Sequence, residues 1–126
     1  MKDQKAMRVK FKVDNLWESP PMHILFTRED DVIVARCLDL TVSSHGNDEK
    51  DAINSLSEAV KEAILSAIEN NVIGRIFDPA HSKYWRMFNE AEAQQVNSQL
   101  TKTLRKSGFE ILENKLPHSS VEISYA

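Results

Sequence analysis

The chain has 126 residues, of which 41% are hydrophobic and 28% charged, and its formal net charge is −3. This length suits one domain with a short extension, and the composition excludes a fibrous or intrinsically disordered protein. A mildly acidic chain lacks the positive electrostatic field that attracts nucleic acid, so we expect no specific binding to duplex DNA. The one cysteine, Cys37, excludes an internal disulfide, and its place in an apolar run predicts a small buried side chain.

The first residues, MKDQKAMRVKFKVD, are charged and lack the apolar centre of a signal peptide. No apolar run reaches membrane-spanning length, so we expect a cytoplasmic protein with no membrane partner. Apolar and charged residues alternate over 7–13, which predicts one half-buried strand at a sheet edge. ESPP (18–21) ends it, because proline lacks the backbone donor that a strand needs.

Two apolar runs follow, MHILFT (22–27) and VIVARCL (32–38), and the polar REDD between them predicts a hairpin. TVSS (41–44) predicts a third antiparallel strand. From Asp48 the apolar period becomes helical, with Asp48 as the N-cap and Asp51 at the position of a capping-box acid.

Asn70-Asn71 predicts the end of this helix, and Asp78-Pro79 predicts a turn in the connector that follows it. Residues 82–106 favour a second helix that ends at Gly108. Its aromatic cluster KYWRMF (83–88) is either an exposed patch for a partner or the face that docks this helix, and the helical spacing of the rings favours docking. FEIL (109–112) and SVEISY (120–125) predict late strands.

The segment of about 24–68 resembles the HicB-like family, small domains best known as antitoxins of toxin–antitoxin pairs. The family pattern is a strand run ending in Asp-Leu, a short strand, a glycine, and a capped helix with an early alanine. This chain has VARCLDLTVSSHG followed by NDEKDA. The matching positions hold Asp39-Leu40, Gly46 and Ala52, while Asp48 replaces the usual threonine cap and Asp51 the usual glutamate.

The resemblance implies an α+β fold with a small antiparallel sheet, ordered β-β-β-α-β as a partial ribonuclease H-like motif. We expect a long amphipathic helix packed on this sheet and a C-terminal helix plus strands. The whole chain, 1–126, is then a single domain with a HicB-like core at 22–72. Residues 74–126 form an extension with no evident DNA-binding module. Because small sheets leave edges that a second copy can cover, we also expect a homo-oligomer.

The candidate functional residues are few. The four histidines lack the spacing of metal ligands, and we expect no metal, no cofactor and no catalytic residue. His45 is either an exposed loop residue before the helix or a contact at an interface, and no nucleophile elbow surrounds the serines beside it. Asp30, Asp31 and Asp39 suit turns. Together with His45 they are the predicted partner-binding residues.

The resemblance implies a non-catalytic protein that occludes a small basic ribonuclease toxin with an acidic surface. The alternative is a stand-alone oligomeric protein of this fold with a structural or regulatory role and no toxin. A hydrolase or nuclease is a third hypothesis. Segment 100–123 shares a basic helix, a Gly-Phe pair and a Lys…His-Ser segment with the start of the HicA-like toxin family. Since Pro117 replaces the glycine usually beside that histidine, we assign no role to His118.

Overall fold

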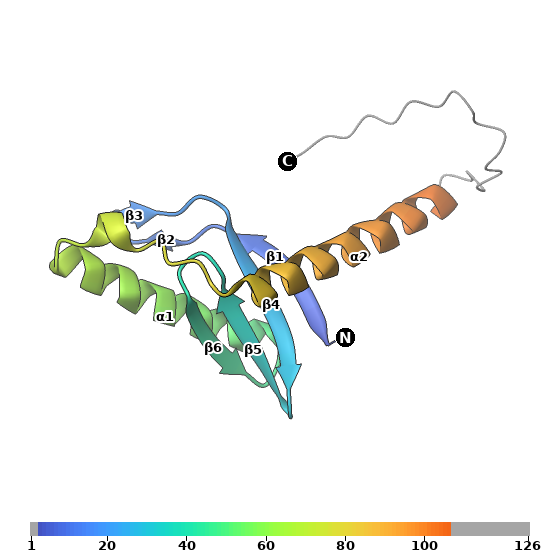
Figure 1. Cartoon of the computed structure of the whole chain (residues 1–126), viewed down its shortest axis with the longest axis horizontal. Helices are drawn as coiled ribbons and strands as arrows, with labels where there is room; N and C mark the ends of the chain where they lie inside the picture. The colour runs from blue at the N-terminus through green and yellow to red at the C-terminus, as the bar shows by residue number, and fades with distance from the viewer. Residues whose placement is uncertain (1–2, 107–126) are drawn as a thin grey trace, which may run out of the picture. The chain divides into compact units, whose positions relative to one another are not determined.

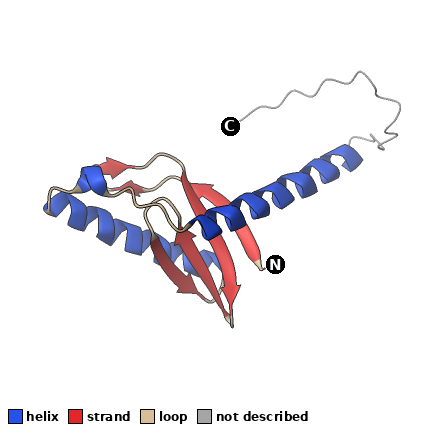
Figure 2. Cartoon of the chain, viewed as in Figure 1, coloured by secondary structure: helices blue, strands red, loops and turns tan. Residues whose placement is uncertain are grey.

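The computed structural model describes residues 3–106 and divides the chain into two compact units, Met1–Gln94 and Gln95–Ala126. Helix α2 begins in the first unit and continues into the second. In chain order the elements are β1 (Gln4–Val9), β2 (Lys12–Val13), β3 (Trp17–Glu18), β4 (Met22–Glu29), β5 (Val32–Cys37), β6 (Val42–Gly46), α1 (Glu49–Glu69), the 3₁₀ turn η1 (Ile73–Arg75) and α2 (Ser82–Lys106) (Figure 1). The predicted α+β class is confirmed (Figure 2).

Four of these strands form one antiparallel sheet in the order β1-β4-β5-β6. The predicted hairpin is β4 and β5, whose two-residue turn is Asp30-Asp31, and the predicted third strand is β6. The resemblance implied that the fourth strand follows the helix. Within residues 3–106 it is instead β1, which precedes the hairpin and pairs with β4 from Gln4 opposite Thr27 to Val9 opposite Met22.

The prediction of one continuous strand over 7–13 is wrong, although β1 does lie at an edge of the sheet that residues 3–106 form. The chain leaves the main sheet after β1 and enters a second, two-stranded sheet made of β2 and β3. Phe11 and Ser19 hold this small hairpin at its base. The Phe11 N–H donates to Ser19 Oγ at 2.8 Å, and the Ser19 N–H donates to the Phe11 carbonyl at 2.8 Å. These two bonds satisfy the N–H and C=O groups of Phe11, which a longer β1 would have paired within the main sheet.

The two ends of α1 follow the predicted signals. Asp48 Oδ1 accepts a hydrogen bond from the Asp51 N–H at 2.8 Å, which confirms the N-cap. The Asp51 carboxylate accepts from the Asn47 N–H, one residue before the cap, rather than from the cap residue as in a standard capping box. Asn70 is the C-cap, and Asn71 follows with a φ of 57°, in the left-handed region that ends many helices.

The sheet has a helix on each face. Met22, Ile24 and Phe26 of β4 point to the face where α1 buries Ala52, Leu56, Val60 and Ile64. Leu25 points to the other face, where it packs with Phe88 and Ala91 from the first half of α2. The docking interpretation of the KYWRMF cluster is therefore confirmed.

Three sequence predictions fall on residues 107–126: the helix end at Gly108, the late strands, and any role of His118. They lie outside the described residues. The first compact unit is also larger than the expected 22–72 core, because it includes β1 and the start of α2. The single-domain expectation stays a prediction. Within residues 3–106, neither helix combines the length and the apolar character needed to cross a bilayer.

Candidate functional site

The turn between β4 and β5 presents carboxylates to solvent. Asp30 and Asp31 are exposed, and Asp30 has a φ of 56°, a conformation that aspartate tolerates better than most residues. Glu29 beside them is half exposed and accepts hydrogen bonds from Thr27 Oγ1 at 2.8 Å and from Arg36 Nη2 at 2.9 Å. These bonds, that of Thr27 first, lower the pKa of Glu29. The turn thus presents three neighbouring carboxyl groups on an accessible surface, which we call the acidic turn (residues 29–31).

Asp39 does not belong to this surface. It follows β5, whereas Asp31 precedes it, so about 20 Å of strand separates them at the usual rise of about 3.3 Å per residue. Its side chain is buried, with 7% of the residue exposed. Asp39 therefore occupies a turn, as predicted, but its carboxylate points inward, away from any partner at the acidic turn.

His45 occupies a third location. It lies within β6, opposite Val34 of β5, so the prediction of a loop position is wrong. Its side chain is exposed, as is that of Ser43, which points to the same face of the sheet. The structure thus brings Asp30 and Asp31 together and places Asp39 and His45 elsewhere.

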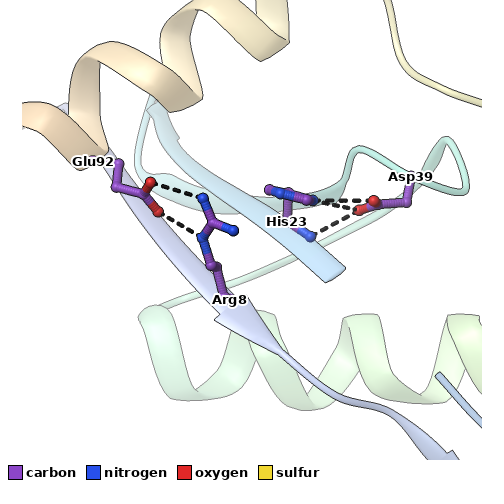
Figure 3. Close-up of polar contacts among 4 residues, drawn as sticks. All are labelled: Arg8, His23, Asp39 and Glu92. Atoms are coloured by element: carbon purple, nitrogen blue, oxygen red, sulfur yellow. Dashed lines mark hydrogen bonds and ion pairs between the residues drawn. The ribbon is translucent and has the colours of Figure 1, made fainter. Parts of the chain in front are cut away.

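Asp39 is engaged by His23, a residue that sequence analysis left without a role (Figure 3). Asp39 Oδ1 accepts from the His23 backbone N–H at 2.7 Å, and its Oδ2 lies 3.0 Å from the ring nitrogen Nδ1. The imidazole ring also makes edge contacts with Trp85 and Phe88 of α2, at centroid distances of 5.0 and 5.2 Å. His23 therefore links the start of β4, the turn after β5 and the docked helix.

A second polar contact, beside His23, ties β1 to the same helix (Figure 3). Arg8 donates from Nε and Nη2 to the two carboxylate oxygens of Glu92, each at 2.9 Å. This paired geometry favours both charged forms. The hydrogen bonds raise the pKa of Arg8 and lower the pKa of Glu92. We call Arg8, His23, Asp39 and Glu92 the polar cluster.

The polar cluster resembles a histidine–carboxylate base only in part. The His23 nitrogen Nδ1 is turned to Asp39, and the ring is packed against two aromatic side chains, so its contacts are those of a structural group. Sequence analysis missed the cluster because its members are far apart in the chain. The alternation of β4 carries the one available signal: it places His23 with Leu25 on the face opposite Ile24.

The cysteine and the possibility of a metal site remain to be considered. Cys37 is buried, as predicted, and burial raises the pKa of its thiol to about 11, so it is protonated near neutral pH. In the part of the chain that the structure describes, no group of three or more His, Cys, Asp or Glu side chains is arranged to hold a metal ion.

The Arg8–Glu92 pair predicts an acid-dependent loss of stability. A carboxylate whose pKa is lowered on folding stabilises the protein above its unfolded pKa, about 4.3 for glutamate, and this contribution disappears as the pH falls through the folded pKa. We expect Glu92→Gln to lower the free energy of unfolding by about 1 kcal/mol or less at pH 7, because the pair is partly exposed. Urea unfolding at neutral pH and near pH 3 checks this.

The pKa of Glu29 is also lowered, so acid weakens the wild type through Glu29 as well. The diagnostic quantity is therefore the difference in free energy of unfolding between the wild type and Glu92→Gln at each pH. That difference should shrink as the solution is acidified. A difference that stays constant from neutral to acidic pH would show that Arg8 does not stabilise the ionised form of Glu92.

Comparison of the chain with protein-family models, with curated proteins and with solved structures finds no match.

Proposed function

We propose that this protein is a HicB-like, non-catalytic binding protein that occludes a small basic ribonuclease toxin. The observation that supports this most directly is the acidic turn. Asp30 and Asp31 are exposed at the tip of a hairpin whose strands are held in the centre of the sheet. Exposed carboxyl groups at a hairpin tip are suited to a basic surface, because complementary charge speeds encounter and fixes the orientation of the partners.

The strand order of the central segment also supports the proposal. β4, β5, β6 and α1 follow one another as the HicB-like resemblance implies for its first four elements. The family's Asp-Leu pair acquires a physical role here: Asp39 holds His23, and Leu40 is buried in the core beneath α1. Asp39 and Leu40 therefore stabilise the domain, and in this proposal the acidic turn is the surface that contacts the partner.

The test begins with a small basic reading frame adjacent to this gene, whose product is co-expressed with the full chain. The two proteins should co-purify, and co-expression should suppress ribonuclease toxicity. Asp30→Asn combined with Asp31→Asn removes two charges and keeps side chains that tolerate the turn. At low salt this variant should bind the toxin about tenfold more weakly, mainly through slower association, and the deficit should shrink as salt is raised.

Glu58→Gln combined with Glu62→Gln is the matched control, because it removes two exposed charges from α1 rather than from the acidic turn. It should bind as the wild type does. If the variant with Asp30→Asn and Asp31→Asn binds the toxin as tightly as this control does, the acidic turn is not the contact surface. If no neighbouring basic product binds the chain at all, the stand-alone alternative replaces this proposal.

A further inference from the structure

The two edges of the four-stranded sheet differ in how they are protected. β1, at one edge, carries Lys5 and Arg8, and both are engaged in ion pairs. β6, at the other edge, has the sequence VSSHG, with no lysine, arginine, aspartate, glutamate or proline. Charged side chains are a common device that keeps edge strands from pairing with other chains. The β6 edge lacks this device.

Among residues 3–106, no strand pairs with the outer side of β6, whose inner side pairs with β5. Ser43 and His45 are exposed, so no bulky cover lies over their face of the strand. An unpaired row of N–H and C=O groups in an otherwise regular sheet is a template for one more strand.

β6 is also held in place before any partner arrives. Its last residue, Gly46, is buried so closely under α1 that a Cβ there would lie 2.5 Å from the Ala52 backbone nitrogen. Val42, which points to the face opposite Ser43 and His45, packs against the core beneath the same helix. A preformed edge loses little conformational freedom on binding, which favours association.

We propose that β6 is a dimerisation strand, which pairs antiparallel with β6 of a second copy to form one continuous sheet. β6 has no lysine, arginine or carboxylate, so two copies can pair without such charges facing each other, whereas two β1 edges would bring Lys5 and Arg8 toward their counterparts. In a register centred on Ser44, Ser43 of each copy lies opposite the second copy's residue 45. This proposal does not rest on the toxin-binding proposal.

An exposed aromatic residue lies near the turn that precedes β6. Phe77 is 66% exposed. The next residue, Asp78, donates its N–H to the Asp39 carbonyl at 2.9 Å, and its own carbonyl accepts from the Thr41 hydroxyl, directly before β6. Phe77 therefore lies next to the segment that leads into the pairing strand. Large exposed aromatics at such places are typical of interfaces.

Sedimentation velocity on the full chain at micromolar concentrations tests the proposal. The wild type should have the mass of two chains. The variant Ser43→Lys with His45→Lys, and the variant Ser43→Glu with His45→Glu, should each dimerise at least about tenfold more weakly, because like charges then face each other across the axis. Mixing the two variants should restore a dimer, since each lysine then meets a glutamate.

Asn54→Lys combined with Ser57→Lys is the matched control, because it adds two lysines at exposed positions of α1 and none on β6. It should remain a dimer, and all variants should keep the circular dichroism spectrum of the wild type. A monomeric wild type would overturn the proposal, as would charged β6 variants that dimerise as tightly as the wild type. A wild type that is monomeric alone and loses a toxin partner through the lysine variant would assign β6 to that partner instead.

Discussion

Replacing Phe88 with alanine should lower the free energy of unfolding by about 3–5 kcal/mol, the usual cost of deleting a buried phenylalanine side chain. Phe88 is fully buried, and it packs with Ala6, Leu25 and Leu38 on the sheet face opposite α1. Phe88 is the largest α2 side chain that is fully buried in this core, so its removal would leave a cavity between the helix and the sheet. Urea unfolding followed by circular dichroism measures the loss.

The substitution should also weaken the polar contacts around it. The Phe88 ring touches the imidazole of His23, and the Arg8 guanidinium lies 5.8 Å from its centroid. Leu16→Ala is the control, because Leu16 is also a large apolar residue but is 62% exposed, and its truncation should change stability by less than about 0.5 kcal/mol. Equal effects of the two substitutions would mean that α2 is not docked through Phe88.

Replacing Gly46 with alanine should cost about 1–3 kcal/mol, the range typical of an overfilled core. The added Cβ would lie 2.5 Å from the Ala52 nitrogen and 2.7 Å from the Asp51 carbonyl carbon. Both are backbone atoms in the first turn of α1, so they cannot move aside as a flexible side chain would. The helix start must shift, and the bond from the Asn47 N–H to the Asp51 carboxylate must lengthen or break.

Gly74→Ala is the matched control in the same chain. A Cβ at Gly74 meets no atom within 4 Å, so alanine should be neutral or should stabilise the protein by up to about 1 kcal/mol through the unfolded state. Thermal or urea unfolding of the two variants gives a direct comparison. If Gly46→Ala were as stable as Gly74→Ala, the close approach of β6 and α1 would be excluded.

Local sequence signals determined the elements that depend on neighbouring residues. The hairpin of β4 and β5 follows from two β-branched runs around a polar turn, and both ends of α1 follow from Asp48 and Asn70-Asn71. The start of α2 at Ser82 agrees with the prediction for the same reason, since helix propensity is a property of short stretches. The predicted burial of Cys37 and the docking of Phe88 rest on apolar periodicity, which is also local.

Tertiary structure alone decided which distant residues meet. No pattern along the chain pairs Arg8 with Glu92. His23 contacts Asp39 because the register of β4 against β5 places the start of β4 beside the turn after β5. The fold also buries Asp39 and exposes Asp30 and Asp31, although the sequence predicted all three equally as turn residues. Periodicity shows that a residue lies on one face of its element. It does not show which other element covers that face, because that depends on contacts between segments far apart in the chain.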